Sequence, residues 1–224
     1  MPTAVEKLSF YSTNGEAPEV NLKDALLQGQ APDRGLYMPR EFPRLSPEEF
    51  AALRELEYPE LANEVLWQYA QGVIDRDLLL QLCRDAYDWE VPLEHVYDRV
   101  HVMRLDQGPT ASFKDFAARI MARLIGEFLK KEGRELTILT ATSGDTGSAV
   151  ASAFHGVDNI RVLVLFPINE VSDRQRKQMT TLTGNIHTLA IDGKFDDCQA
   201  MVKRAFSDPE LQALPLSSAN SINI

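Results

Sequence analysis

The sequence contains few cysteines and no long apolar run. Cys83 and Cys198 are its only two cysteines, and neither belongs to a cluster with metal-ligand spacing. We therefore expect free thiols in a reducing compartment, no disulfide framework and no metal site. No stretch of eighteen apolar residues occurs, and the start MPTAVEKLSF lacks the apolar core of a signal peptide. These absences predict a soluble, cytoplasmic protein without a membrane partner.

Positive charge is also scarce, since the formal net charge of the 224 residues is -10. The cluster of Arg174, Arg176 and Lys177 is too short to neutralise a run of phosphates, so we expect no nucleic-acid partner. The chain also lacks the Gly-Lys-Ser/Thr ending of a Walker loop and the Gly-x-Gly-x-x-Gly dinucleotide fingerprint. The common nucleotide-binding loops are therefore excluded.

The residue pattern divides the chain into two parts. Residues 1–45 are rich in turn signals, and 46–90 favour helices, opened by Ser46, Pro47 and Glu49 as N-cap, N1 and N3. From residue 98 onward, apolar strands alternate with helices. The expected strands are 100–105, 136–141, 160–166 and 186–191, and the expected helices are 113–131, 146–154, 172–182 and 196–206. We therefore predict a mostly helical N-terminal subdomain, 1–97, and an α/β domain, 98–224, with a doubly wound, mainly parallel sheet.

The loop Gly108–Asp115 is the first segment that indicates chemistry, because ligands bind beyond the carboxyl ends of such strands. Ser112 and Asp115 have the spacing of a capping box, which predicts a helix from Phe113 with Lys114 at its second position. The ammonium form of a lysine is unfavourable at the positive end of a helix dipole. An amine nucleophile needs this environment, because it reacts in its neutral form. On spacing alone, an ordinary exposed lysine is the more common alternative.

The loop Thr142–Gly147 is the second such segment. Its glycines allow a ligand to approach the backbone, and N–H groups at a helix start suit a carboxylate or phosphate. An ordinary strand-to-helix turn fits the composition equally well. Asp145 is unexpected in an anion site, since it repels the ligand unless it bonds a cationic or hydroxyl group.

Both loops, in this order and at this separation, resemble those of the fold-type II pyridoxal-phosphate (PLP) enzymes, and of the threonine synthase family in particular. The segment GPTASFKDF at 108–116 resembles the family's PLP-lysine segment, and ATSGDTG at 141–147 resembles its substrate loop. Cysteine synthases and threonine dehydratases typically carry asparagine where Asp145 stands. Segments 24–29, 193–199 and 218–223 also resemble the family, so the likeness covers essentially the whole chain.

The resemblance implies a fold-type II α/β enzyme that converts O-phospho-L-homoserine, a small molecule, and water to L-threonine and phosphate. It implies PLP as the cofactor and Lys114 as the catalytic residue that carries it. The implied cofactor-binding residues are Lys114, Asp145, Asn220 and Asn223, and the implied substrate-binding residues are Thr110, Ser112, Ser143, Gly144, Asp145, Thr146 and Gly147. For Ser112, an N-cap role alone is an equal alternative.

Three departures from the family pattern and two alternative functions accompany this resemblance. Asp106-Gln107 stands where relatives often have Phe-His, and Asn169 stands where glycine is common. Family members continue past the 218–223 segment into the loop that cradles the PLP phosphate, so we expect a chain that is incomplete at its C-terminus. Another PLP phospholyase of this fold, or a fragment that binds no cofactor, remains an alternative function. A monomer or a homodimer is expected.

Overall fold

The computed structural model describes residues 8–211 and 213–218. Within these residues the chain forms two compact units that divide between Glu90 and Val91. The predicted boundary after residue 97 lies past the first strand of the second unit, and it stays a prediction. No helix in the described part of the chain is long and apolar enough to cross a membrane.

The first unit is mostly helical. A small antiparallel pair, β1 (Phe10–Ser12) and β2 (Tyr37–Pro39), flanks helix α1 (Leu22–Gln28) along the chain. Four further helical segments follow: α2 (Pro47–Ala52), a 3-10 turn (Leu53–Glu55), α3 (Tyr58–Ala70) and α4 (Arg76–Ala86). Ser46 accepts a hydrogen bond from the Glu49 N–H, and the Glu49 side chain bonds back to the Ser46 backbone. The predicted helix start is therefore confirmed.

The second unit contains a four-stranded parallel sheet, in the order β7-β6-β5-β8. Its strands are β5 (Leu136–Ala141), β6 (Ile160–Pro167), β7 (Ile186–Ile191) and β8 (Leu216–Ser217). Its helices are α5 (Lys114–Glu132), α6 (Asp145–Phe154), α7 (Asp173–Thr180) and α8 (Phe195–Ser207). The predicted α/β fold with a parallel sheet is confirmed, and all four predicted helices are present with small shifts of their ends.

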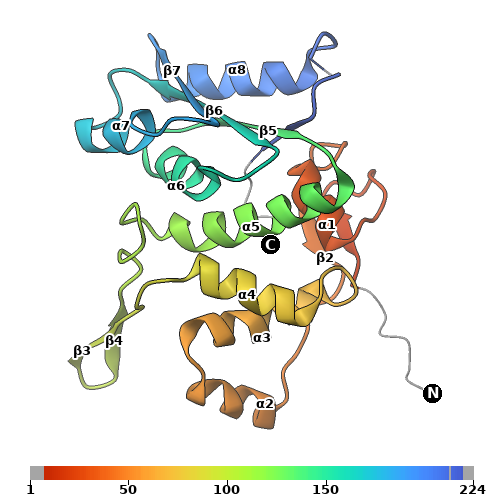
Figure 1. Cartoon of the computed structure of the whole chain (residues 1–224), viewed down its shortest axis with the longest axis vertical. Helices are drawn as coiled ribbons and strands as arrows, with labels where there is room; N and C mark the ends of the chain where they lie inside the picture. Colours follow the sequence, from red (N-terminus) through yellow and green to blue (C-terminus); the bar gives the residue numbers. More distant parts are fainter. Residues whose placement is uncertain (1–7, 212, 219–224) are drawn as a thin grey trace. The chain divides into compact units, whose positions relative to one another are not determined.

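Helices cover both faces of this sheet (Figure 1). Helix α8 packs on one face, against β5 and β6, while α6 and α7 lie on the other and α5 packs against α6. Strand β6 is buried on both faces, with Val164 fully buried on one and its neighbour Leu165 only 4% exposed on the other, because helices cover both faces of the sheet. On α5, Ile120, Leu124 and Phe128 are buried in the predicted apolar stripe. This layering fixes the positions of α5 and α6, and the two predicted loops lead into the first turns of these helices.

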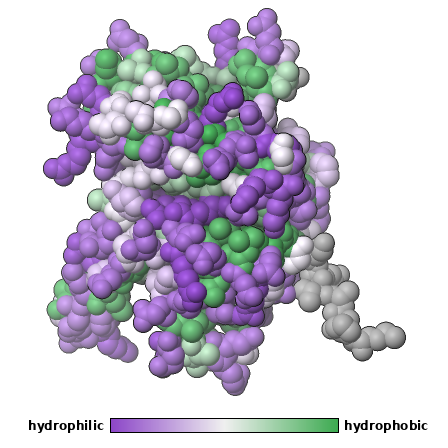
Figure 2. All heavy atoms as spheres, in the orientation of Figure 1, coloured by the Kyte–Doolittle hydropathy of each residue, from purple (hydrophilic) through white to green (hydrophobic). Residues whose placement is uncertain are grey.

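The strand predicted at 100–105 does not belong to this sheet. It is β4 (Val100–Met103), which forms an antiparallel hairpin with β3 (Leu93–Tyr97) through a two-residue turn. Asp98 in that turn has a φ of 47°, and the tight turn pairs β4 with its predecessor along the chain instead of with β5. Both strands are exposed along their whole length, and apolar side chains reach the surface there (Figure 2).

Candidate active site

The lysine loop, residues 108–113, folds back onto a buried carboxylate of the following helix. Asp115 is 1% exposed, and its two oxygens accept hydrogen bonds from the Thr110 N–H at 2.8 Å and the Thr110 hydroxyl at 2.7 Å. A Cβ added to Gly108 would lie 2.6 Å from Asp115 Oδ2, so this close approach requires a glycine. The residue at position 115 therefore determines the shape of the loop that precedes Lys114.

The capping box predicted from Ser112 and Asp115 is absent. Ser112 Oγ accepts a hydrogen bond of 3.3 Å from the Lys114 N–H, and the helix begins at Lys114, one residue later than predicted. Asp115 binds Thr110 because that residue offers two donors, a backbone N–H and a hydroxyl, whereas a capping box offers the Ser112 N–H alone. Lys114 is accordingly the first residue of α5.

The Lys114 side chain is half-buried and lies over an aromatic ring. Its Nζ atom is 4.5 Å from the centroid of the Phe113 ring. Among the described residues, no carboxylate forms an ion pair with it. Ala111, three residues before Lys114, adopts a φ of 55°, which is uncommon for a residue with a side chain. An amine with no counter-ion in the described part of the chain is thus placed at the end of a constrained loop.

The substrate loop, residues 142–147, is closed by the hydroxyl of a buried threonine. Thr142 is 1% exposed, and its Oγ1 accepts hydrogen bonds from the N–H groups of Gly144 at 2.9 Å and Gly147 at 2.8 Å. Within the described residues, the N–H groups of Ser143, Asp145 and Thr146 have no acceptor. Three donors around the start of α6 are therefore available to an anion.

Helix α7 joins the two loops. Its Gln175 Nε2 donates to Asp145 Oδ1 at 2.7 Å, and its Gln178 Nε2 donates to the Thr110 carbonyl at 3.2 Å. Neither glutamine is among the residues predicted from the sequence. The Ser172–Gln175 spacing could have located a capping box, which the structure contains, but not the partners, which lie 30 and 68 residues away.

The other predicted site residues have distinct environments. Thr110 and Ser112 are 8% and 7% exposed, and the Thr110 hydroxyl is engaged by Asp115. No described residue accepts a hydrogen bond from the Ser112 hydroxyl. Asn220 and Asn223 lie outside the described residues. The structure thus brings Thr110 and Asp145 together through α7 and leaves the two asparagines unplaced.

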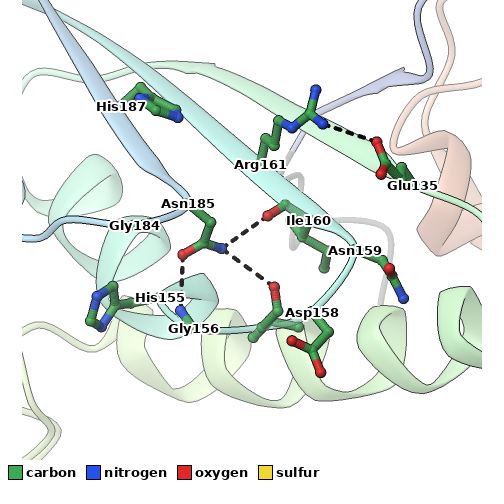
Figure 3. A pocket seen from close by; sticks show the side chains of 11 residues that line it. Glu135, His155, Gly156, Asp158, Asn159, Ile160, Arg161, Gly184, Asn185 and His187 are labelled. Carbon is green, nitrogen blue, oxygen red and sulfur yellow. Dashed lines mark hydrogen bonds and ion pairs between the residues drawn. The ribbon is translucent and has the colours of Figure 1, made fainter.

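A cavity of about 450 Å³ lies elsewhere, at the amino ends of β5, β6 and β7 (Figure 3). Asn185 closes its floor: its Nδ2 donates to the carbonyls of Phe154 and Ile160, and its Oδ1 accepts from the Gly156 N–H. Ligands of doubly wound sheets bind at the opposite, carboxyl ends of the strands. The bonds of Asn185 give it a structural role in joining the ends of α6 and β7.

Comparisons with known proteins identify the family. Residues 90–224 match the family described as pyridoxal-phosphate dependent enzyme, and residues 9–87 match the family described as threonine synthase N terminus. The chain belongs to the pyridoxal-phosphate-dependent enzyme family. It is 42% identical over 96% of its length to threonine synthase from Pseudomonas aeruginosa, and 40% identical over 97% to that from Escherichia coli.

Solved structures of this pyridoxal-phosphate-dependent family agree with the fold. A PLP-bound threonine synthase from Brucella melitensis matches with a TM-score of 0.88 and 42% identity over 96% of this chain. The Escherichia coli enzyme matches with a TM-score of 0.87 and 40% identity over 96%. The chain spans about half of each relative, 48% of the Pseudomonas protein and 50% of the Escherichia coli protein.

Proposed function

We propose that this chain supplies the lysine-bearing part of a threonine synthase, which converts O-phospho-L-homoserine and water to L-threonine and phosphate. The observation that carries the proposal is one arrangement: Lys114, free of any described carboxylate, begins α5, while a loop with three available N–H donors begins α6. One helix, α7, holds both loops. The relatives named threonine synthase support the reaction.

The residues present fit PLP as the cofactor. A primary amine without a counter-ion and near a helix start is the group that a PLP enzyme uses for attachment. PLP supplies the electron sink for carbanions formed on the substrate. Lys114 Nζ then holds and moves the protons, because no other amine or imidazole is part of the lysine loop or the substrate loop.

The substrate is bound by the two loops. The N–H groups of Ser143, Asp145 and Thr146 receive its carboxylate, while Gly144 and Gly147 keep the shape of the loop by donating their N–H groups to Thr142. The Ser112 hydroxyl, which accepts from the Lys114 N–H and donates to no described residue, contacts the phosphate of the substrate. Thr110 contributes to substrate binding only by shaping the lysine loop, because its hydroxyl donates to Asp115. Roles for Asn220 and Asn223 near the cofactor ring remain part of the proposal.

Three further assignments belong to this proposal. The reaction class is that of a carbon-oxygen lyase acting on a phosphate ester. The location is the cytoplasm, which the two free, buried cysteines favour. The protein is a monomer or a homodimer.

The test measures products and cofactor attachment in the protein as its natural host produces it. With O-phospho-L-homoserine we expect equal amounts of threonine and phosphate, together with a visible absorbance band from lysine-linked PLP. Lys114→Ala removes the band and lowers turnover by several orders of magnitude, whereas Lys131→Ala, in the exposed last turn of α5, leaves both unchanged. Phosphate released with a keto acid and without threonine would contradict the synthase assignment and indicate another phospholyase.

A further inference from the structure

Asp145 places a negative charge where the substrate loop offers its donors to an anion. Its carboxylate is exposed at the first residue of α6, beside the available N–H groups of Ser143 and Thr146. A mobile carboxylate in this position competes with the ligand for those donors and repels it. In the structure the carboxylate is held by a hydrogen bond, which Gln175 Nε2 donates to Asp145 Oδ1 at 2.7 Å.

The orientation of the Gln175 amide is fixed by the start of α7. Its Oε1 accepts hydrogen bonds from the Ser172 hydroxyl at 2.8 Å and from the Ser172 N–H at 3.2 Å. Because both partners there are donors, the oxygen must face Ser172 and the amide nitrogen must face Asp145. The amide also lies against Gly144, where an added Cβ would be 2.4 Å from Nε2.

Other residues hold α7 independently of Gln175. Gln178 donates to the Thr110 carbonyl of the lysine loop, one helical turn further along. Met179 is fully buried, and its sulfur would lie 2.9 Å from a Cβ added to Gly147. A change at Gln175 therefore leaves the helix anchored, which makes its contact with Asp145 testable by itself.

We propose that Gln175 is a positioning residue of the active site. Its amide, which is fixed at the start of α7, holds the Asp145 carboxylate in place. The substrate loop therefore keeps one conformation and presents its N–H groups to the carboxylate of the substrate. The conformational part of the inference concerns this chain alone, while the identity of the bound carboxylate rests on the proposed function. Gln175 affects substrate binding only through its hydrogen bond to Asp145.

Gln175→Glu is the decisive variant. Glutamate is the usual partner in a serine capping box, so the start of α7 is retained, but a second carboxylate now faces Asp145. In the 224-residue chain at pH 7, we expect the hydrogen-exchange protection of the Gly144 and Gly147 amides to fall about tenfold or more. Protection at Lys177 and Gln178 stays unchanged. Arg174→Gln, which changes the net charge equally at the neighbouring position, is the matched control.

The pH dependence separates this effect from a packing defect. Protonation of one carboxylate restores a donor between positions 175 and 145, so protection recovers in Gln175→Glu as the pH falls, and it does not change in this way in the wild type. The other titratable or charged groups on α7, α6 and β7 are Asp173, Arg174, Arg176, Lys177 and His187, and those beside the Thr110 contact of Gln178 are Lys114 and Asp115. All of them are shared with the wild type, which therefore controls for their titration.

A reversed pair gives the rescue. In the double variant Asp145→Asn with Gln175→Glu, the amide at 145 donates to the carboxylate at 175, and loop protection returns to within about threefold of wild type. In the natural protein, Gln175→Glu raises the KM for O-phospho-L-homoserine about tenfold with a smaller change in kcat, and the double variant lowers it again.

Each outcome decides the proposal. Wild-type protection in Gln175→Glu, or no recovery in the double variant, overturns it. If Gln175→Glu alone fails to fold, the double variant must fold with a protected loop, and failure of both overturns it as well. Because the exchange measurement needs no substrate, a wild-type protein that makes no threonine contradicts the proposed function and leaves this test intact.

Discussion

The lysine loop and the substrate loop have similar positions, and each is bound by a glutamine of α7, but the side chains that hold them from inside differ in charge. Each precedes a helix of the same α/β unit, α5 or α6. The lysine loop is held mainly from within, because a buried carboxylate five residues later binds both donors of Thr110. The substrate loop is held by a neutral hydroxyl inside and by a glutamine 30 residues away. Because hydrogen bonds to a buried carboxylate are stronger than those to a hydroxyl, we expect the lysine loop to open less readily than the substrate loop.

The strongest test of this comparison removes the carboxylate of the lysine loop. Asp115→Ala leaves the N–H and hydroxyl of Thr110 buried without their acceptor, so we expect the free energy of unfolding to fall by about 3 kcal/mol. Asp173→Ala, at an exposed carboxylate that pairs with Arg176, should change it by less than about 0.5 kcal/mol. Denaturant titration measures both. Equal, small losses would show that Asp115 does not hold the loop.

A smaller effect is expected from the hydroxyl that closes the substrate loop. Thr142→Val keeps the side-chain shape but removes the acceptor of the Gly144 and Gly147 N–H groups, and we expect a loss of about 2 kcal/mol. Thr142→Ser keeps the hydroxyl, so it should retain the protection of these two amides in hydrogen exchange. A loss larger than that of Asp115→Ala would reverse the proposed order of rigidity.

The smallest effect on stability is expected from a carboxylate that binds several donors in a loop of the first unit. Asp33 accepts hydrogen bonds from the Ser12 hydroxyl and from the N–H groups of Glu16, Ala17 and Gly35. The Ser12 hydrogen bond, opposed by desolvation and aided by the backbone donors, lowers the pKa of Asp33. The stabilisation is therefore fully present above about pH 4, the ordinary pKa of an aspartate, and is lost as the pH falls through the lower folded pKa.

The variant Asp33→Asn tests how much the charge of Asp33 contributes to stability, for comparison with the two loops. The variant should be less stable than wild type at pH 7, and the difference should shrink as the pH is lowered below about 4. Thermal unfolding of both proteins at several pH values measures it. A difference that is independent of pH would mean that the charge of Asp33 contributes nothing.

The residues that could be predicted from the sequence are those whose structure depends on near neighbours. The largely apolar segment 160–166 predicted β6, which ends one residue later, and Ser46 with Glu49 predicted the start of α2. The two loops were located by their composition. Even locally, however, Ser112 and Asp115 were misassigned, because Thr110 offers Asp115 two donors at once.

What escaped prediction depends on distant residues. Strand β8 has only two residues and exists because it pairs with β5 some eighty residues earlier in the chain. Gln175 and Gln178 look like ordinary polar residues of an exposed helix until the fold places Asp145 and Thr110 beside them. The predicted roles of Ser143, Gly144, Thr146 and Gly147 as substrate ligands stay predictions, and Thr142, which binds two of their N–H groups, was not singled out.

The attachment site of the cofactor tests the central claim most directly. The protein is incubated with PLP, the linkage is fixed by borohydride reduction, and the modified lysine is located by peptide mapping and mass spectrometry. The account predicts that the label is on Lys114, that Lys114→Ala abolishes it, and that Lys131→Ala does not. Labelling on another lysine, or equal labelling in the Lys114→Ala variant, would contradict the account.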